Sequence, residues 1–226
     1  SSSGDKPFIL RQQITDNIAA VQAELTGVPL HFGGDAPESS MEALYQGAKG
    51  YGYDQNCNGI YDSATDVQPF LSSADDAFSG AAGQSYNSTD SGGGTIGGFG
   101  FRDYALPVLV YATDNELRDP DEGYGVPGGC PLDAGASDVV DAINDLGGYT
   151  IGVLAQAWST APLGPMEELA EATGSLADTD GDGVADDLLV FQWEGAATGD
   201  FKRTVVDAIE DLINSIRFSR VELEVE

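Results

Sequence analysis

Residues 107–113 read Pro107-Val-Leu-Val-Tyr-Ala-Thr113, an apolar run that stops abruptly at Asp114. A short apolar run bounded by a polar residue is typical of a parallel strand that is buried on both faces. Two similar runs follow at 149–155 and 188–193. The sequence therefore predicts three buried parallel strands in this part of the chain.

Helical patterns separate these runs. Ser137 can cap a helix that ends before Gly147, a second helix starts near Pro165, and a long amphipathic helix covers 201–216. Alternation of strands with helices is typical of an α/β domain with a mostly parallel sheet. We expect a three-layer α/β/α, doubly wound fold of the Rossmann-like type.

The pattern is less regular towards the N-terminus. We expect a strand at 7–13, a helix through about Leu25, and a second helix that begins at Ser39 or Ser40 and ends at Gly50. These elements are assigned to the same domain as the three strands.

Residues 51–103 interrupt the alternation, because they are rich in Gly, Ser, Asp and Asn and show no amphipathic period. A structureless loop of this length is uncommon inside a compact domain unless it is functional or held by metal. We interpret it as a metal-binding insertion in a domain that covers 1–217. Residues 218–226, in which apolar and acidic residues alternate from Arg220, are expected to form a terminal strand or a linker to a following domain.

The charge balance limits the possible partners. The chain has 38 acidic residues against 9 basic ones, a net charge of −29 at pH 7 and a pI near 4.1. Binding to nucleic acid or to an anionic membrane surface requires clustered Lys and Arg, so both partners are excluded. No apolar run reaches the ~20 residues of a membrane helix, so no membrane span is expected. Such acidity suits a halophilic protein, whose surface charge is screened by salt, and also one whose carboxylates bind divalent cations; we expect both effects.

Cys57 and Cys130 are the only cysteines, and both lie in polar, Gly-rich surroundings outside any Cys-x-x-Cys pair. Zinc and redox motifs are therefore absent, and we predict a disulfide between two loops; the alternative is two free thiols. Asn87 opens an Asn-Ser-Thr sequon for N-glycosylation. These features favour an extracellular or cell-surface location.

Two Asp-rich loops follow the calcium-loop pattern, in which oxygen ligands come at positions one, three and five, Gly at six allows a sharp turn, and a backbone carbonyl binds at seven. Neither loop has the usual Glu at position twelve, so a later Asp or a remote residue must supply the last ligand. The alternative for each loop is an Asp/Gly-rich turn without an ion. The expected Ca²⁺ ligands are Asp54, Asn56, Asn58, Ile60 (carbonyl), Asp62 and Asp66 in the first loop, and Asp178, Asp180, Asp182, Val184 (carbonyl), Asp186 and Asp187 in the second.

A third group of oxygen ligands is expected beyond the carboxyl ends of the strands, where open α/β sheets bind their ligands. Asp114 follows the run at 107–113, and Asp35 and Glu38 lie in a turn that leads into a helix. Carboxylates that converge there suit a hard divalent cation. The alternative is that Asp35 and Glu38 only complement the positive end of the helix.

The order of these segments resembles the von Willebrand factor type A domain, in its integrin β-subunit-like branch. The turn Gly33-Gly-Asp-Ala-Pro-Glu-Ser39 is similar to the Asp-x-Pro-Glu turn of that branch, and the strand that ends in Thr113-Asp114 follows in the same order. The resemblance covers most of the chain outside 51–103. Further segments that match in order are 138–146, 149–154, 166–175 and 201–216.

The resemblance implies a metal-ion-dependent adhesion site at Glu38 and Asp114, which would hold Mg²⁺ or Ca²⁺. It also implies a neighbouring Ca²⁺ site at Asp35, the Pro37 carbonyl and Glu38. The family's Asp-x-Ser-x-Ser motif does not occur in this sequence. Because the strand expected at 7–13 corresponds to the family's third, the resemblance implies that an upstream segment or a second chain completes the sheet.

Together these features favour a non-enzymatic, metal-dependent protein-binding or adhesion domain. By the resemblance, the metal keeps one coordination position open for an acidic side chain of a protein ligand. One alternative is a structural module of a surface layer or fibre that Ca²⁺ rigidifies. The third is a metal-dependent hydrolase, since a two-metal site can be built from carboxylates, although no nucleophile–base pair is visible.

Overall fold

The computed structural model describes residues 6–28, 37–71, 84–87, 90–124, 130, 133–155, 159–193 and 198–223. The chain divides into two compact units. The first unit contains Ser1–Pro107 and Arg118–Leu146, and the second contains Val108–Leu117 and Gly147–Glu226. Each unit is therefore built from two separate stretches of sequence.

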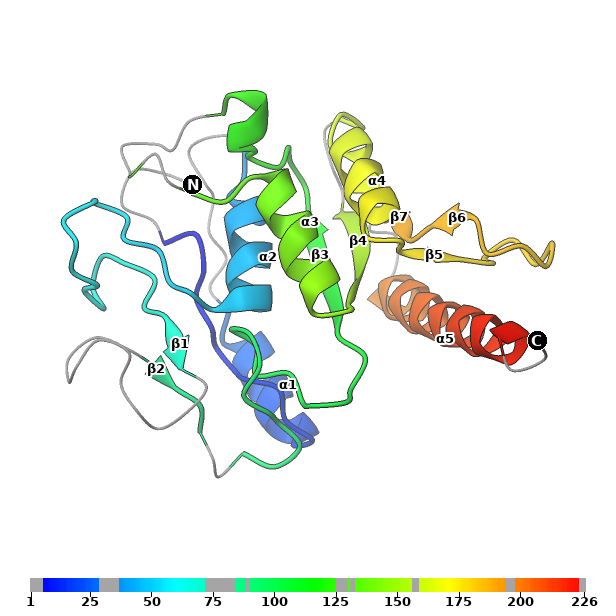
Figure 1. Ribbon diagram of the computed structural model, residues 1–226, viewed down its shortest axis with the longest axis horizontal. Helices are drawn as coiled ribbons and strands as arrows, with labels where there is room; N and C mark the ends of the chain where they lie inside the picture. The colour runs from blue at the N-terminus through cyan, green and yellow to red at the C-terminus, as the bar shows by residue number, and fades with distance from the viewer. Residues whose placement is uncertain are drawn as a thin grey trace. The chain divides into compact units, whose positions relative to one another are not determined.

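A parallel sheet of three strands lies in the second unit (Figure 1). Its strands are β3 (Val108–Thr113), β4 (Tyr149–Ala155) and β7 (Val190–Trp193), in the order β3-β4-β7. The register places Val108 opposite Tyr149 and Gly152 opposite Val190. The predicted α/β class and its three parallel strands are confirmed, and the sheet is compatible with a Rossmann-like fold.

Two helices pack on this sheet, α4 (Leu163–Ala172) and α5 (Thr198–Leu223). In β4, Ile151 is fully buried and packs with Ala208 and Leu212 of α5. The next residue, Gly152, points to the other side of the strand, where an added Cβ would lie 2.8 Å from Cε of Met166 in α4. The two helices thus contact opposite sides of β4, and the missing side chain at Gly152 lets α4 approach closely.

A short antiparallel hairpin completes the second unit. Its strands are β5 (Leu176–Ala177) and β6 (Asp187–Leu188), which pair so that Ala177 is opposite Asp187. Ala177 is fully buried and joins the core with Leu189 and Leu212. The base of the hairpin is therefore anchored in the core, whereas its loop at 179–186 is exposed.

The first unit consists of helices and irregular segments. Its described elements are α1 (Ile18–Thr26), α2 (Ser40–Lys49), α3 (Ala136–Asp145), the 3₁₀ turn η1 (Pro120–Glu122) and the parallel pair of β1 (Phe70–Leu71) and β2 (Gln84–Ser85). Helix α2 packs against α3. It carries Glu42 in its first turn and Lys49 in its last, and it ends at Gly50, whose φ of 67° favours glycine. The predicted helix from Ser39 or Ser40 to Gly50 is confirmed.

Residues 6–17 contain no strand, so the strand predicted at 7–13 is wrong. This segment instead makes isolated hydrogen bonds to a Gly-rich stretch, such as that from Ile14 N to Phe99 O at 2.9 Å. Isolated contacts with an irregular partner do not repeat at the spacing of a ladder, so no sheet forms. The strand that the resemblance assigns to the family's third position is therefore absent from 7–13.

The end of the chain also differs from the expectation. Helix α5 continues to Leu223, so 220–223 do not form the terminal strand that was one of the two expectations for 218–226, the other being a linker; 224–226 lie outside the described residues. Alternation over so few residues does not separate a strand from the continuation of a long helix. The domain boundary after 217 and the interpretation of 51–103 as an insertion stay predictions.

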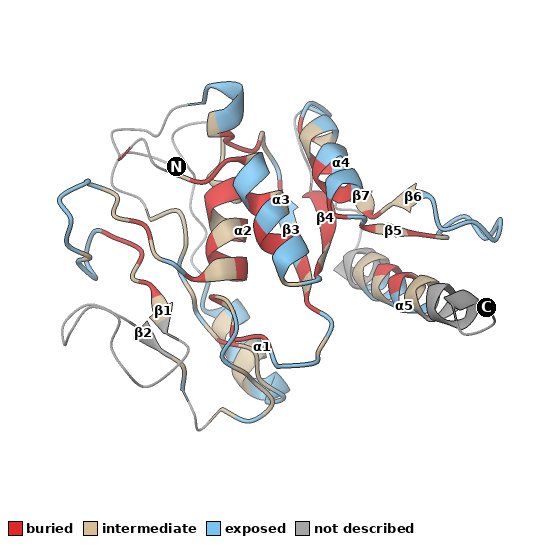
Figure 2. Cartoon of the chain, viewed as in Figure 1, coloured by how far each residue is buried: buried red, intermediate tan, exposed pale blue. Residues whose placement is uncertain are grey.

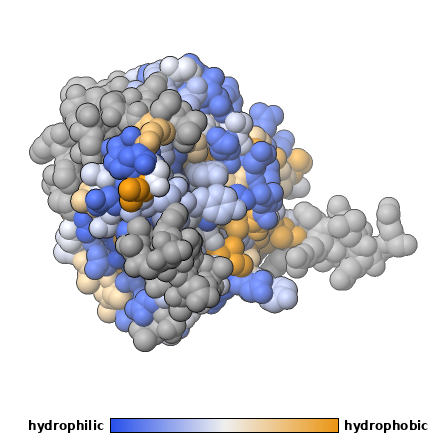
Figure 3. Space-filling model, turned by 60° about the vertical axis from the view of Figure 1, so that its left-hand side comes forward, coloured by the Kyte–Doolittle hydropathy of each residue, from blue (hydrophilic) through white to orange (hydrophobic). Residues whose placement is uncertain are grey.

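Burial follows the helical period in α3 and α4. Helix α3 buries Val139, Ala142 and Ile143, α4 buries Met166 and Leu169, and Figure 2 shows a buried and an exposed face on each. On the face drawn in Figure 3, hydrophilic residues predominate among the coloured atoms, and hydrophobic residues form small separate spots. None of the described helices is both long and apolar enough to cross a membrane.

Candidate metal centre

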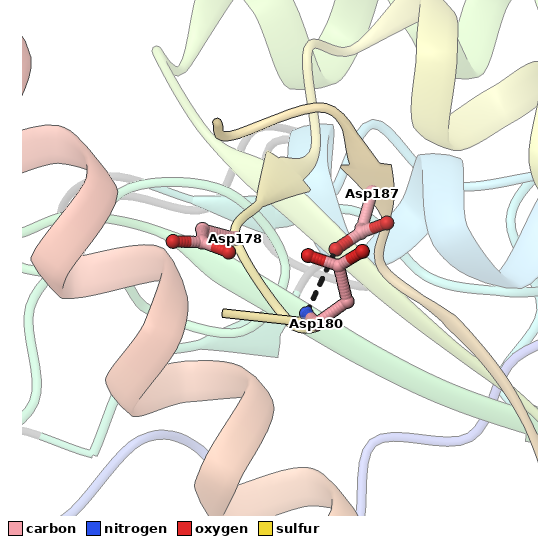
Figure 4. A group of neighbouring side chains, drawn as sticks. All are labelled: Asp178, Asp180 and Asp187. Carbon is pink, nitrogen blue, oxygen red and sulfur yellow. Dashed lines mark hydrogen bonds between the residues drawn. The ribbon is translucent and has the colours of Figure 1, made fainter. Parts of the chain in front are cut away.

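The loop between β5 and β6 brings three carboxylates together. Asp178 follows β5 directly, and Asp187 is the first residue of β6. Among the described residues, the carboxylate oxygens of Asp178, Asp180 and Asp187 form a group whose members all lie within 4.8 Å of one another (Figure 4). Convergence of carboxylate oxygens is what a hard divalent cation requires. Three of the residues predicted from the calcium-loop pattern are thus adjacent in space.

Backbone hydrogen bonds to carboxylates hold this loop in shape. The carboxylate of Asp178 accepts from Gly181 N at 2.8 Å and from Gly183 N at 3.0 Å. Both glycines have positive φ, 81° and 89°, which L-residues with a Cβ rarely adopt. Asp180 and Asp182 each accept from the N–H two residues further on, at 3.0 and 2.8 Å. The alternating Asp and Gly residues therefore produce the turns that bring the oxygens together.

Asp187 closes the loop. One of its carboxylate oxygens accepts from Thr179 N at 2.8 Å, Thr179 Oγ1 at 2.9 Å and Asp180 N at 3.1 Å. These bonds, those from Thr179 above all, lower the pKa of Asp187, so its carboxylate stays ionised and can bind a cation. Its other oxygen has no hydrogen bond among the described residues and is available as a ligand.

A further carboxylate, which the sequence pattern did not indicate, lies close to this loop. Asp211 is on α5, next to Leu212, which packs with Ala177 at the base of the hairpin. Burial raises the pKa of Asp211, and the negative charges of Asp207 and Asp178 raise it further. Asp211 therefore adds to the negative potential at the Asp178 end of the loop.

The loop at 54–66 is closed in the same way, by an antiparallel bridge between Tyr53 and Val67. Asp54 accepts from Gly59 N at 2.7 Å and from Asn58 N at 3.3 Å. Asn58 N is also bonded to the Asn56 side chain at 3.0 Å, and the Asn58 side chain accepts from the next-but-one N–H, that of Ile60, at 2.7 Å. The calcium-loop pattern therefore produces the same series of turns here.

Asp66 closes this second loop from a buried position. Its side chain is only 1% exposed and accepts from Gln55 N at 3.1 Å and from Asp62 N at 2.7 Å. Asp62 in turn accepts from Ala64 N at 2.7 Å. Asp66 thus holds both ends of the loop together, and its burial makes it part of the first unit's interior.

A disulfide joins this loop to another segment of the first unit. Cys57 and Cys130 are bonded, with their Cα atoms 5.3 Å apart, so the predicted pairing is confirmed. Cys130 is buried, its N–H donates to Gln55 O at 2.7 Å, and its carbonyl accepts from the Tyr53 hydroxyl at 2.6 Å. Three contacts therefore fix the start of the loop against Cys130.

The residues of the expected adhesion site belong to different units. Glu38 precedes α2 in the first unit, where its carbonyl accepts from Arg118 N at 2.7 Å. Asp114 is exposed and follows β3 in the second unit. Pro37 is partly buried, and Asp35 lies outside the described residues. The metal sites that the resemblance implies at these residues stay predictions.

Glu42 is a buried acid that sequence reasoning missed. It is 5% exposed; Oε1 accepts from Gln46 Nε2 at 2.7 Å and Oε2 from Ala134 N at 2.7 Å. Burial raises the pKa of Glu42 to about 7, although these two hydrogen bonds oppose the rise. Helix periodicity gives no sign of this burial, because a Glu in the first turn of a helix is normally an exposed partner of its dipole.

Asn87 is exposed, and its side-chain amide donates to Asp90 at 3.1 Å. Ser88 and Thr89, the remainder of the sequon, lie outside the described residues, and glycosylation stays a prediction.

Comparison with protein-family models, with curated proteins and with solved structures finds no match to this chain.

Proposed function

We propose that this chain is a calcium-stabilised, non-enzymatic module of a secreted or cell-surface protein. The convergence of Asp178, Asp180 and Asp187 at the β5–β6 turn carries the proposal. Asp182, Asp186 and the carbonyl of Val184 complete a set of oxygen ligands in one short loop. Ca²⁺ takes six to eight oxygen ligands in flexible geometry, whereas Mg²⁺ keeps several waters, so an all-oxygen loop of this kind favours Ca²⁺.

Calcium would stabilise the fold because it removes repulsion that the metal-free loop contains. The loop follows Asp178 with four more Asp residues and no Lys or Arg before Leu188, in a chain of net charge −29. The base of the hairpin is anchored in the core through Ala177 and Leu189. An ion that binds only the folded loop therefore adds directly to the stability of the second unit. Loop 54–66 in the first unit has the same sequence pattern and the same turns, but among the described residues Asp54, Asp62 and Asp66 do not form a converging group, so its Ca²⁺ site rests on the pattern alone.

A location outside the cell is consistent with two observations. A disulfide between Cys57 and Cys130 persists in oxidising compartments. Loops of this class in extracellular proteins work with Ca²⁺ constants of about 10⁻⁴–10⁻³ M, so they need an environment rich in the ion.

Calorimetric titration of the full chain with CaCl₂ at high NaCl tests the proposal. We expect two bound ions, of which one is lost in Asp180→Ala. Glu168→Gln is the matched control, because Glu168 is an exposed acid on α4 of the same unit. A wild-type chain that takes up no Ca²⁺ contradicts the proposal.

Metal-dependent adhesion is a second candidate, and the exposure of Asp114 directly beyond the carboxyl end of β3 favours it. In this proposal the second unit belongs to a three-layer fold of the von Willebrand factor type A kind. Asp114 would be a ligand of Mg²⁺ or Ca²⁺, to which a protein ligand adds an acidic side chain. In the described sheet β3 pairs only with β4, which leaves its other edge for a strand from an upstream segment or a second chain.

Mn²⁺, which has a paramagnetic signal, is a suitable probe of this adhesion site. With Ca²⁺ present to occupy the Asp-rich loops, we expect one Mn²⁺ ion to bind, and Asp114→Ala to abolish that binding. If Mn²⁺ binds Asp114→Ala as it binds the wild-type chain, the adhesion site is refuted and the structural module remains.

A further inference from the structure

Asn58 and Gly59 form an Asn-Gly pair at the exposed turn of loop 54–66, and the sequence contains no other such pair. In an Asn-Gly pair the glycine N can attack the side-chain amide, because glycine has no Cβ to hinder the approach. Both residues are exposed, and no described residue apart from the chain neighbours lies within 4 Å of the place where a Cβ of Gly59 would stand. The backbone and water therefore both have access to the amide of Asn58.

The hydrogen bonds of the turn place around this pair the groups that the reaction needs. Gly59 N, the nucleophile, donates to Oδ2 of Asp54 at 2.7 Å, so a carboxylate is in place to take its proton. Asn58 Oδ1 accepts from Ile60 N at 2.7 Å, and this N–H can stabilise the negative charge that develops on the oxygen. The departing nitrogen, Nδ2 of Asn58, makes no hydrogen bond within the described part of the chain. Base, nucleophile and oxyanion donor thus lie in one turn.

Asn56, two residues earlier, lacks two of these features. Asn56 is also exposed, and its side chain accepts from Asn58 N at 3.0 Å. The residue that follows it is Cys57, which has a Cβ and is held in the disulfide. Cys57 N donates to the backbone carbonyl of Asp54 at 3.3 Å and not to a carboxylate. Asn56 is therefore an internal control with the same exposure in the same loop.

Asp182 occupies the corresponding position in loop 178–187. Its surroundings are the same, because Gly183 N donates to Asp178 at 3.0 Å and Val184 N donates to Asp182 at 2.8 Å. A carboxylate is a poor target for a nucleophile, since it already carries a negative charge. The neutral amide of Asn58 thus makes the same turn reactive in loop 54–66.

We propose that Asn58 is a site of spontaneous deamidation, at which Gly59 N attacks Cγ of Asn58. The N–H proton passes to Asp54 as the N–Cγ bond forms. The Cγ–Nδ2 bond then breaks, and the same proton leaves with the nitrogen as ammonia. Water opens the resulting cyclic succinimide at either carbonyl, which gives aspartate or isoaspartate. In sum one water is consumed and one ammonia is released, with no oxidation or reduction.

The products change the loop in charge and in shape. Each conversion adds one negative charge to a chain of net charge −29. Aspartate gives the fifth position the residue type that loop 178–187 has there. Isoaspartate instead routes the backbone through Cγ, which moves Gly59 N away from Asp54. The inference does not rest on the proposed function, because the reaction needs no metal.

Incubation of the full, oxidised chain in EDTA and high NaCl at mildly alkaline pH, followed by peptide mapping, tests the inference. Mass spectrometry detects conversion as a gain of about one dalton at Asn58, and enzymatic methylation of isoaspartate distinguishes the two products. We expect Asn58 to convert about tenfold faster than Asn56, or more. Equal rates at the two asparagines would overturn the inference.

Two variants test the geometry of the turn. Gly59→Ala places a Cβ beside the attacking nitrogen, whereas Asp54→Asn keeps a hydrogen-bond acceptor and removes the base. We expect each variant to slow the conversion of Asn58 about tenfold in the folded chain. In urea, where the turn is lost, Asp54→Asn should react as fast as the wild-type chain, and Gly59→Ala should stay slow.

Two results would contradict the role of the turn. If Asn58 reacts in urea but is preserved in the folded wild-type chain, the turn protects the amide and the inference is wrong. If folded Asp54→Asn reacts as fast as the folded wild-type chain, Asp54 takes no part in the reaction and the proposed geometry is overturned. Neither result alters the uptake of Ca²⁺ by the wild-type chain, so this inference and the proposed function fail separately.

Discussion

Loops 54–66 and 178–187 lie in different units, yet both begin in the same way. Each opens with an Asp directly after a residue in an antiparallel pair, Tyr53 in one case and Ala177 in the other. In each, the Gly at the sixth position donates to the first Asp: Gly59 N at 2.7 Å and Gly183 N at 3.0 Å. The shared pattern of residues therefore produces the same turn in two unrelated surroundings.

The two loops are also closed by equivalent carboxylates. Asp66 accepts from the N–H of the second loop residue, Gln55, and Asp187 accepts from that of Thr179, also the second. The surroundings of these two acids differ, because Asp66 is 1% exposed and Asp187 is only partly buried. Both loops are thus closed by a carboxylate, but this carboxylate differs between them in its place in the loop and in its burial.

The difference between the loops lies in what stabilises each turn. Loop 178–187 uses glycine at its fourth position and Asp at positions three and five. Loop 54–66 uses a cross-linked Cys57 at the fourth position, with the neutral Asn56 and Asn58 at positions three and five. One pattern of residues can therefore be held in shape either by Asp side chains and glycine, or by a buried carboxylate and a disulfide. We expect the first arrangement to depend more strongly on a bound ion.

Removal of Ca²⁺ should have the largest effect and should act on both loops. An ion at a hundred times its Kd adds about 2.7 kcal/mol per site, so chelation should lower the summed free energy of unfolding by roughly 5 kcal/mol for two sites. Urea unfolding in EDTA and in CaCl₂ at about a hundred times the measured Kd, at one high NaCl concentration, measures this. Identical curves would show that neither loop binds an ion that matters to the fold.

Reduction of the disulfide should come next and should affect only the first unit. The bond closes a loop with a sequence separation of 73 residues, for which the chain-entropy model gives a stabilisation of roughly 4 kcal/mol. Tryptophan fluorescence reports on the second unit, because both tryptophans, Trp158 and Trp193, belong to it, and its transition is expected to stay in place. A shift of that transition on reduction would contradict the separation of the two loops. Thiol titration of the denatured, unreduced chain should find no free thiol.

The pH dependence of stability should also differ between the two units, because Glu42 lies in the first unit, which contains loop 54–66. The pKa of Glu42 rises from 4.5 to about 7 in the folded state, so its contribution to stability is fully present below pH 4.5 and is lost as the pH rises through 7. The loss is at most about 3 kcal/mol. Urea unfolding between pH 5 and 8, at saturating Ca²⁺, should show this slope in the wild-type chain and a flatter profile in Glu42→Gln. Parallel profiles in the two chains would show that a group other than Glu42 causes the pH dependence.

Exchanging Asn and Asp at the third and fifth positions should make the Ca²⁺ affinities of the two loops more alike. We expect Asn56→Asp with Asn58→Asp to lower the Ca²⁺ Kd of loop 54–66 about tenfold, or about 1.4 kcal/mol, because anionic oxygens attract the ion more strongly. The same exchange should destabilise the chain in EDTA. Asp180→Asn with Asp182→Asn is the reciprocal variant and should weaken loop 178–187. Calorimetric titration of both variants with CaCl₂ measures these Kd values. Unchanged Kd values would show that ligand charge does not cause the difference between the loops.

The smallest effect is expected at Asp211. Asp211→Asn removes a negative charge near Asp178 and should stabilise the metal-free chain by about 0.5 kcal/mol, since solvent screens partly exposed charges. In saturating Ca²⁺ this gain in stability should vanish, because the loss of the negative charge of Asp211 also weakens the attraction for the bound ion. Glu210→Gln, at an exposed neighbour on α5, is the control. A gain of equal size in EDTA and in Ca²⁺ would separate Asp211 from the calcium loop.

Much of the second unit follows from the sequence alone. The apolar runs that become β3, β4 and β7 are short, bounded by polar residues and separated by helical periods, so local pattern and burial point to the same fold. The turns of the two Asp-rich loops, 54–66 and 178–187, are predictable for a related reason. Their turns come largely from hydrogen bonds that Asp or Asn side chains early in each loop accept from N–H groups a few residues further on, and such contacts depend on the local sequence.

Tertiary structure decided the rest. Nothing local distinguishes Glu42 from an exposed acid on a helix, because its burial comes from the segment that donates through Ala134, far along the chain. The segment at 7–13 has the composition of a strand but finds no regular partner, and a strand exists only when a neighbour satisfies its backbone. The roles of Asp66 and Asp187 likewise depend on where each loop closes. Contacts between residues distant in sequence have no local signature, so only the folded chain selects them.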